Sequence, residues 1–318
     1  MPACSIIIRA FNEERFIGRL LESIQLQTVK NVETILVDSG STDKTLDVAC
    51  RYPVKIVSIP PQDFSFGRAL NVGLEESTAD LAVLASAHVY PLYSDWIERI
   101  LHHFSDSRVA LCYGRQRGNG KTSYAEKRIF SSWYPAASEQ DQKTPFCNNA
   151  NAAIRREVWQ RLPYNEDLTG LEDLEWGKKV KEAGYRIVYC AESEVVHVHD
   201  EPPLSVFHRY QREAMALKKI YPEERFTLLD FVKLFPGNVI NDLTSAWRES
   251  VFRKHFREIM LFRLMQFWGT YCGFRRRGKM TSDLRKRLYY PGGVGTGQAL
   301  QVNAGKKPLC IHETEIKG

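Results

Sequence analysis

The stretch Val32-Glu-Thr-Ile-Leu-Val-Asp-Ser-Gly-Ser-Thr-Asp43 joins a strand pattern to a polar turn. Residues 32–37 are predominantly apolar, which is typical of a strand buried inside a parallel sheet. Residues 38–43 are of the kinds that form turns and cap helices, and a helical pattern follows through Cys50. A strand that passes through a short polar turn into a helix is the repeating unit of a parallel α/β sheet.

The same unit recurs along the first part of the chain. Further strands are predicted at 4–9, 54–59 and 81–85, and helices follow Asn12 and span 66–77. This alternation predicts a doubly wound, mostly parallel sheet flanked by helices and joined by right-handed crossovers. Ligands of such sheets bind at the carboxyl ends of the strands. The segments of chemical interest are therefore 10–14, 38–43 and 86–88.

The rest of the chain is less regular and then becomes helical. The patterns predict strands at 109–113, 186–190 and 194–199, and helices at 122–133, 156–161, 174–183, 204–221, 228–248 and 252–274. We expect an α/β catalytic domain at 1–203, a helical extension rich in basic and aromatic residues at 204–290, and a flexible tail at 291–318.

Composition narrows the class of protein. The 318 residues are 43% hydrophobic and 26% charged, which is ordinary for a globular protein, and no run of about 18 apolar residues predicts a membrane span. The first residues are interpreted as a strand rather than a signal peptide. The seven cysteines are scattered and odd in number, which argues against a disulfide framework or a structural zinc site and fits a reducing cytosol. Neither a P-loop nor a dinucleotide-binding glycine motif follows the first strand.

A group of acids precedes the helix at 174–183. The segment Gly170-Leu-Glu-Asp-Leu-Glu-Trp176 places Glu172, Asp173 and Glu175 within four positions. A carboxylate held where a helix begins can serve as a proton acceptor. Acids in a first turn can instead simply complement the helix dipole.

Histidines end two of the predicted strands. Ser86-Ala-His88 closes the fourth strand, and Val196-His-Val-His199 places two imidazoles on one face of a later strand. A single histidine at such a position is often only structural. His88, His197 and His199 together could form an open, exchangeable metal site.

Five segments in order resemble the inverting family-2 glycosyltransferases, which have the nucleotide-diphospho-sugar transferase fold. The resemblance covers about residues 3 to 200. The matching segments are Ser5-Ile-Ile-Ile-Arg-Ala-Phe-Asn-Glu-Glu14, Ile35-Leu-Val-Asp-Ser-Gly-Ser-Thr-Asp43, Gly67-Arg-Ala-Leu-Asn-Val-Gly73, Ser86-Ala-His88 and Gly170-Leu-Glu-Asp-Leu-Glu-Trp176.

The resemblance implies roles for particular residues. Asp173 would be the general base, and Glu172 would support it or hold the acceptor. The predicted nucleotide- and donor-binding residues are Ala10, Phe11, Glu13, Asp38, Arg68, Asn71, Ser86 and His88. Because amides bond hydroxyls and aromatic rings stack on sugars, the predicted acceptor contacts are Asn148, Asn149 and Trp176, although core packing is an equal alternative for Trp176.

One segment departs from the family pattern. Ser86-Ala-His88 stands where the family usually has Asp-x-Asp, whose aspartates hold Mg²⁺ or Mn²⁺ on the donor diphosphate. His88 occupies a ligand position, and His197 matches a histidine that some relatives place beside the diphosphate. We expect a divalent cation, and imidazole ligands suit Mn²⁺ better than Mg²⁺. The alternative is a metal-free site in which His88, Arg68 or Arg155 neutralises the diphosphate.

The resemblance implies inverting transfer of a hexosyl or deoxyhexosyl group from a nucleoside diphosphate to a hydroxyl of a glycan or lipid-linked acceptor, in surface polysaccharide assembly. A nucleotidyltransferase is disfavoured because the loop after the first strand, Asn12-Glu-Glu14, is acidic. A non-catalytic basic protein that binds nucleic acid or membrane is the other alternative. No nucleic-acid-binding module is recognised, and no nucleic-acid partner is expected.

The helix predicted at 252–274 is rich in aromatic residues and leads into Arg275-Arg-Arg277. The net charge is +6, and basic residues are concentrated at 275–287. Apolar and basic residues side by side suit a helix lying on an anionic membrane. We therefore predict a cytoplasmic protein, peripheral at the inner face of the membrane, that binds through 252–277. The alternative is a helix packed on the catalytic domain with solvated arginines.

Overall fold

A computed structural model describes residues 1–278, 284 and 288, so the predicted tail at 291–318 lies outside the described residues. In the described part, one eight-stranded sheet has the order β3-β2-β1-β4-β7-β6-β8-β5. The strands are β1 (Cys4–Ala10), β2 (Val32–Asp38), β3 (Lys55–Ser58), β4 (Leu81–Ser86), β5 (Val89–Pro91), β6 (Val109–Arg117), β7 (Asn151–Arg155) and β8 (Arg186–His197).

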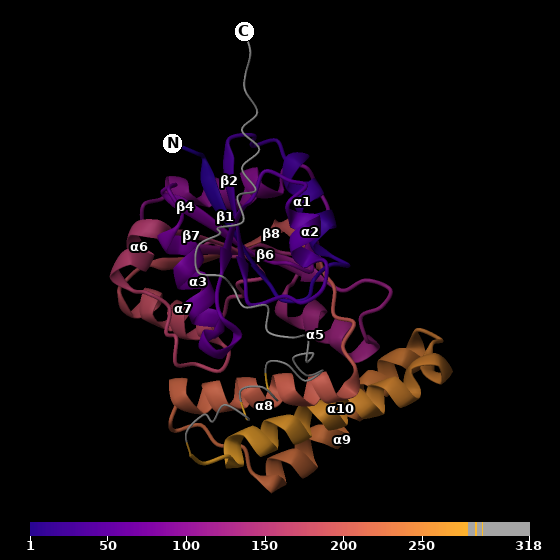
Figure 1. Ribbon diagram of the computed structural model, residues 1–318. Helices are drawn as coiled ribbons and strands as arrows, with labels where there is room; N and C mark the ends of the chain where they lie inside the picture. The colour runs from indigo at the N-terminus through magenta and orange to yellow at the C-terminus, as the bar shows by residue number, and fades with distance from the viewer. Residues whose placement is uncertain (279–283, 285–287, 289–318) are drawn as a thin grey trace.

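Helices follow most of the strands, and three more complete the described chain (Figure 1). They are α1 (Ile17–Gln25), α2 (Thr45–Ala49), α3 (Phe66–Glu75), α4 (Trp96–His102), α5 (Tyr124–Trp133), α6 (Arg156–Arg161), α7 (Glu172–Glu182), α8 (Pro203–Ile220), α9 (Leu228–Arg248) and α10 (Phe252–Arg275). Two short 3₁₀ turns lie at Pro61–Asp63 and His103–Ser105.

The sheet is covered by helices on both faces, which explains why β1 and β2 are apolar almost throughout. Ile6 and Ile8 of β1 point into one core cluster with residues of α1 and α4, whereas Ile7 points into a second with residues of α3, α6 and α7. The layers are therefore helix, sheet and helix, with a hydrophobic core on each face of the sheet.

The predicted α/β architecture is confirmed, with a mixed sheet. β1 pairs in parallel with β2 and β4, β2 with β3, and β6 with β8. β7 is antiparallel to both β4 and β6, and β5 is antiparallel to β8. The strand at Asn151–Arg155 was not predicted, because its run of small apolar residues is too short to signal a strand.

The two strands predicted at 186–190 and 194–199 are one strand, β8. The gap predicted between these two strands corresponds to an irregularity in the pairing of β8 with β6, where the register shifts between Gly114 and Gln116. A Cβ atom at Gly114 would lie 2.1 Å from the carbonyl oxygen of Ser193. Glycine therefore permits the close approach that keeps β8 continuous.

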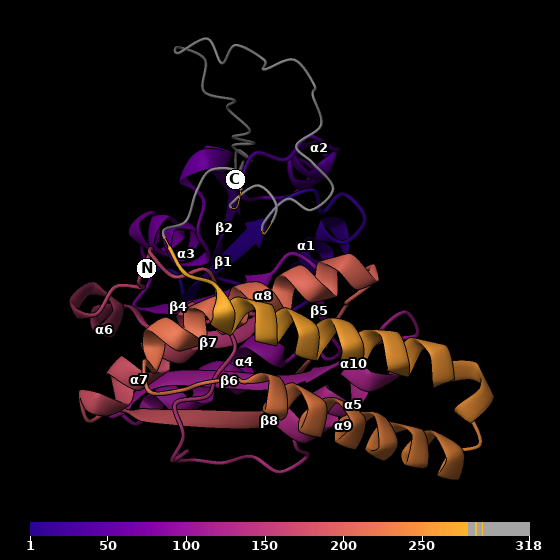
Figure 2. The ribbon, with the colours of Figure 1, turned by 90° about the horizontal axis from the view of Figure 1, so that it is seen from below.

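The three C-terminal helices form where the sequence predicts them. α10 lies between α8 and α9 (Figures 1 and 2). Glycines make its contact with α8 close, because a Cβ at Gly269 would lie 2.5 Å from the Phe207 carbonyl oxygen and one at Gly273 would lie 2.5 Å from that of Gln211. Much of the predicted membrane helix is thus packed against protein.

Candidate active site

A cavity of about 430 Å³ opens at the carboxyl edge of the sheet. Its walls come from the ends of β1, β4 and β8, the start of α7, and α8. Eight predicted site residues line it: Glu13, Ser86, His88, Asn148, Glu172, Asp173, His197 and His199. Tertiary structure thus brings together groups more than a hundred residues apart in the sequence.

Asp173 lies in the first turn of α7, which begins at Glu172. The preceding residue, Leu171, has a φ of 53° in the left-handed region, which turns the chain sharply into the helix. Burial, and then the charge of Glu172, raise the pKa of Asp173 to about 7. The carboxyl therefore exchanges its proton near neutral pH, as a general base must.

The side chain of Glu172 is held in place by an ion pair with Arg9. Its Oε1 accepts a hydrogen bond from Arg9 Nη1 at 2.8 Å, and both side chains are mostly buried. Arg9 also lies over the ring of Phe66, with 5.2 Å between its Cζ and the ring centroid. The pair joins the end of β1 to the start of α7 and keeps a negative charge beside Asp173.

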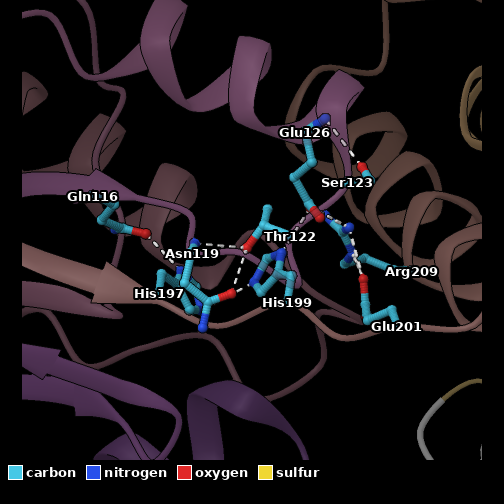
Figure 3. Close-up of polar contacts among 9 residues, drawn as sticks. All are labelled: Gln116, Asn119, Thr122, Ser123, Glu126, His197, His199, Glu201 and Arg209. Carbon is cyan, nitrogen blue, oxygen red and sulfur yellow. Dashed lines mark hydrogen bonds and ion pairs between the residues drawn. The ribbon is translucent and has the colours of Figure 1, made fainter. Parts of the chain in front are cut away.

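Two of the histidines face each other across a short distance. Their Nε2 atoms, on His197 and His199, are 3.0 Å apart (Figure 3). His197 Nδ1 lies 2.7 Å from the amide oxygen of Gln116, and His199 Nδ1 lies 2.7 Å from Oε1 of Glu126. Both partners accept hydrogen bonds, so both Nδ1 atoms carry protons and the Nε2 atoms converge.

That convergence leaves a place for a cation. Burial, and then the neighbouring His199 and His88, hold the pKa of His197 well below its usual range, so its ring is neutral. Nitrogens whose opposite ring atoms are held by a carboxylate or an amide are typical of metal-ligating histidines.

His88 completes this group from the end of β4. One ring nitrogen each of His88, His197 and His199 lies within 4.8 Å of the others. His88 Nδ1 bonds Oε1 of Glu13 at 2.7 Å. Burial lowers the pKa of His88, but the charge and hydrogen bond of Glu13 outweigh it and the net pKa is raised.

A second set of possible metal ligands, two acids and a histidine, lies next to the three histidines, but its acids are already paired with an arginine. Glu126, His199 and Glu201 offer ligand atoms within 4.8 Å of one another. The guanidinium of Arg209 bonds Glu126 at 2.6 Å and Glu201 at 2.7 Å (Figure 3). Burial raises the pKa of Glu126, but Arg209 and His199 outweigh it and lower that pKa to about 2. Arg209 thus acts as the cation here.

The segment Gly67–Gly73 has a structural role that differs from the predicted one. All the hydrogen-bonding capacity of buried Asn71 is used, because its amide binds Tyr164 O, Tyr164 N, Glu166 and the indole of Trp159. Arg68 pairs with Glu166 at 3.1 Å and does not line the cavity. These side chains anchor the loop that leads to α7 rather than contacting the cavity.

Five other predicted residues also stay outside the cavity lining: Ala10, Phe11, Asp38, Asn149 and Trp176. Trp176 is fully buried and donates its indole N–H to Leu162 O, so the core alternative is the correct one. Asp38 accepts the N–H groups of Gly40 and Ser41 and shapes its own turn. Asn149 is buried and accepts from the Tyr164 hydroxyl.

Several lining residues were not predicted, chiefly Arg9, Gln116, Arg209, Arg212 and Glu213. Arg9 could have been predicted as a site residue, since it is a charged residue at the end of an otherwise apolar strand. The residues of α8 could not, because nothing in the sequence places the first helix of the predicted extension over the cavity. The cavity is therefore built by both the predicted domain and the predicted extension.

Paired carboxylates and cations at the carboxyl edge of an α/β sheet are the features expected of an enzyme that binds a phosphorylated ligand there, and the comparisons with known proteins give its class as glycosyltransferase. Residues 5–162 match the family model Glycosyl transferase family 2. The chain is 31% identical over 218 residues to O-antigen chain rhamnosyltransferase RfbN of Salmonella typhimurium, covering 65% of this chain and 69% of the relative. Rhamnosyltransferase WbaN of Salmonella anatum is 30% identical over 223 residues, or 66% and 70% of the two chains. The chain belongs to glycosyltransferase family 2.

The fold agrees with this assignment. Mannosyltransferase PcManGT of Pyrobaculum calidifontis, solved with GDP-Man and Mn²⁺, superposes with a TM-score of 0.58 over 91% of this chain and 88% of its own, at 18% identity. Membership of the glycosyltransferase family sets aside the nucleotidyltransferase and non-catalytic alternatives. Among the described helices, none is long and apolar enough to cross a membrane.

Proposed function

We propose that the protein transfers a sugar from a nucleoside diphosphate to an acceptor hydroxyl with inversion at the anomeric carbon. The observation that carries the proposal is Asp173, a carboxyl with a pKa of about 7 facing the cavity beside the Arg9–Glu172 pair. A single displacement needs one base and no protein nucleophile.

In this mechanism Asp173 accepts the acceptor hydroxyl proton as that oxygen attacks the anomeric carbon. The bond from that carbon to the diphosphate oxygen breaks on the opposite face, and the nucleoside diphosphate leaves with the bonding electrons. Glu172 pairs with Arg9, and its charge helps to keep the proton affinity of Asp173 high. The cationic side chains of the cavity favour the departing diphosphate.

We propose His88, His197 and His199 as the residues that hold a divalent cation. Their convergent ring nitrogens and the fixed Nδ1 partners of His197 and His199 fit such an ion. When bound, the cation supplies positive charge that stabilises the leaving diphosphate. Imidazole ligands favour Mn²⁺ over Mg²⁺, and a solved structural neighbour carries Mn²⁺ with its nucleotide sugar.

For the acceptor, we propose a growing surface polysaccharide, glycan or lipid-linked, because two relatives are O-antigen chain rhamnosyltransferases. This makes a deoxyhexose the first donor sugar to test. A second cavity of about 310 Å³ adjoins the first and shares Trp133 with it. Trp133 is partly exposed and packs edge-on against Phe146, so it presents a ring on which an acceptor sugar can stack.

The test is a thermal-shift screen of UDP, GDP and dTDP and their sugar conjugates, rhamnose included, each with and without Mn²⁺. A ligand that binds the folded state raises the melting temperature by mass action. We expect one nucleotide to give the largest increase and Mn²⁺ to enlarge it. NMR of the product with that donor should show the inverted anomer. No stabilisation by any nucleotide, or a retained anomeric configuration, would contradict the proposal.

A further inference from the structure

Helix α9 carries an apolar stripe that no described residue covers. Leu229, Val232, Ile240 and Trp247 are 80%, 58%, 63% and 71% exposed. Their spacings of three, eight and seven residues return to the same side of a helix. Soluble proteins rarely expose large aliphatic and aromatic side chains in line, and such patches mark interaction surfaces.

The stripe continues onto α10. Leu261, Leu264 and Trp268 of α10 are partly exposed at helical spacing. Trp268 packs edge-on against Phe231 of α9 with ring centroids 5.5 Å apart, so the exposed residues of α10 adjoin α9. α9 and α10 lie next to each other on the outer layer of the molecule (Figure 2). Their exposed aliphatic and aromatic side chains together form an apolar face.

A cationic cavity of about 930 Å³ lies where α9 begins. Among its described lining residues, one is an acid, Glu224, and four are cations: Lys218, Arg225, Arg275 and Arg277. Within residues 1–278, 284 and 288, none of these cations has an ion-pair partner. Leu228 lines the same cavity, so unpaired positive charge adjoins the apolar face.

We propose that this face docks on an anionic phospholipid bilayer, with the α9 stripe in the headgroup boundary and the cationic cavity around lipid phosphates. Apolar side chains next to several cations are what binding in that boundary requires. A second copy of this chain is a poorer occupant, because a twofold contact would bring the same unpaired cations together. The contact falls chiefly on α9 rather than on the predicted helix 252–277, since α10 is packed between α8 and α9.

The test is co-sedimentation of the full chain with phosphatidylcholine vesicles, with and without about 30% phosphatidylglycerol, in low and high salt. We expect binding that needs the anionic lipid and weakens with salt. Arg225→Gln with Arg277→Gln should weaken partitioning about 30-fold, because each cation near an anionic surface contributes about 1 kcal/mol, or about fivefold. Leu229→Asp with Ile240→Asp should weaken it at least about tenfold.

Matched controls use exposed residues away from α9. Leu26→Asp, and Arg51→Gln with Arg161→Gln, should leave partitioning unchanged; each variant must keep the wild-type circular dichroism spectrum and melting temperature. Asp173→Asn should also bind vesicles normally, so failure of this proposal is distinct from failure of the catalytic one. Absence of vesicle binding would overturn the inference. So would equal losses in the controls, or a solution dimer that Leu229→Asp dissociates.

Discussion

Asp173→Asn should destroy catalysis while stabilising the fold. The substitution keeps the size of the side chain but removes its ionisation. If Asp173 is the base, turnover should fall by about 10²- to 10⁴-fold. The same carboxyl is held in a site that disfavours its charge, because burial and Glu172 raise its pKa from 3.8 to about 7. The working enzyme therefore holds an unfavourable charge at neutral pH.

The size of that cost follows from the pKa. One pKa unit corresponds to about 1.36 kcal/mol, so the full difference is about 4 kcal/mol. The side chain is only partly buried, so we expect about 2–4 kcal/mol. The folded state keeps its proton up to about pH 7, whereas the unfolded state loses it near 3.8. Wild-type stability therefore falls as the pH rises between these values, and the loss is complete above pH 7.

Two assays check the prediction. Urea unfolding should show no gain for Asp173→Asn below about pH 4 and the full gain of about 2–4 kcal/mol above pH 7. The wild-type rate should rise with pH through about 7 as Asp173 ionises. Glu175→Gln, which alters another acid on the same turn, should change turnover less than twofold. Near-normal turnover of Asp173→Asn, or no stability gain at high pH, would refute the reasoning.

Three further predictions test the cation site and the packing. His197→Ala should raise the Mn²⁺ concentration for half-maximal activation of metal-stripped enzyme by about 10- to 100-fold; an unchanged Mn²⁺ titration would remove His197 from the cation site. Asp242→Ala should lower the free energy of unfolding by about 3–5 kcal/mol, because it leaves buried Arg263 without its 2.7 Å partner. A loss below about 1 kcal/mol in urea unfolding would mean that water already screens the pair. Gly114→Ala should cost about 3 kcal/mol, since its Cβ would meet Ser193 O at 2.1 Å. Gly237→Ala, in open space on α9, should instead stabilise by up to about 1 kcal/mol; equal effects of the two substitutions would contradict the packing argument.

The sheet could be predicted from the sequence in the first part of the chain, where strands and helices alternate. Strands β1, β2 and β4 and helix α3 are continuous apolar or amphipathic runs closed by turn residues, and local patterns of this kind survive folding. Strand β7 was missed because five residues pair antiparallel in the middle of the sheet without a pattern of their own. Its place was decided by the neighbours β4 and β6.

The candidate site was partly predictable for the same reason. Glu13, His88, Asp173 and His197 follow strands or begin a helix, and the rule that ligands meet at the carboxyl edge brings them together. The motif at 67–73 led to a prediction that the structure does not support for Asn71. The side-chain amide of Asn71 bonds the backbone of Tyr164 instead of facing the cavity. A sequence motif does not tell whether a polar side chain supports a loop or a ligand.

The sequence by itself determined the family, the α/β sheet, the three C-terminal helices and the acid at position 173. Only the tertiary structure decided that Arg9 holds Glu172, that α8 covers the cavity, and that Gln116 and Glu126 orient two histidines toward each other. The physical reason is the distance along the sequence over which each kind of interaction acts. Periodicity and capping act over a few neighbouring residues, whereas the pKa of a buried carboxyl and the direction of an imidazole depend on side chains that arrive from distant parts of the chain.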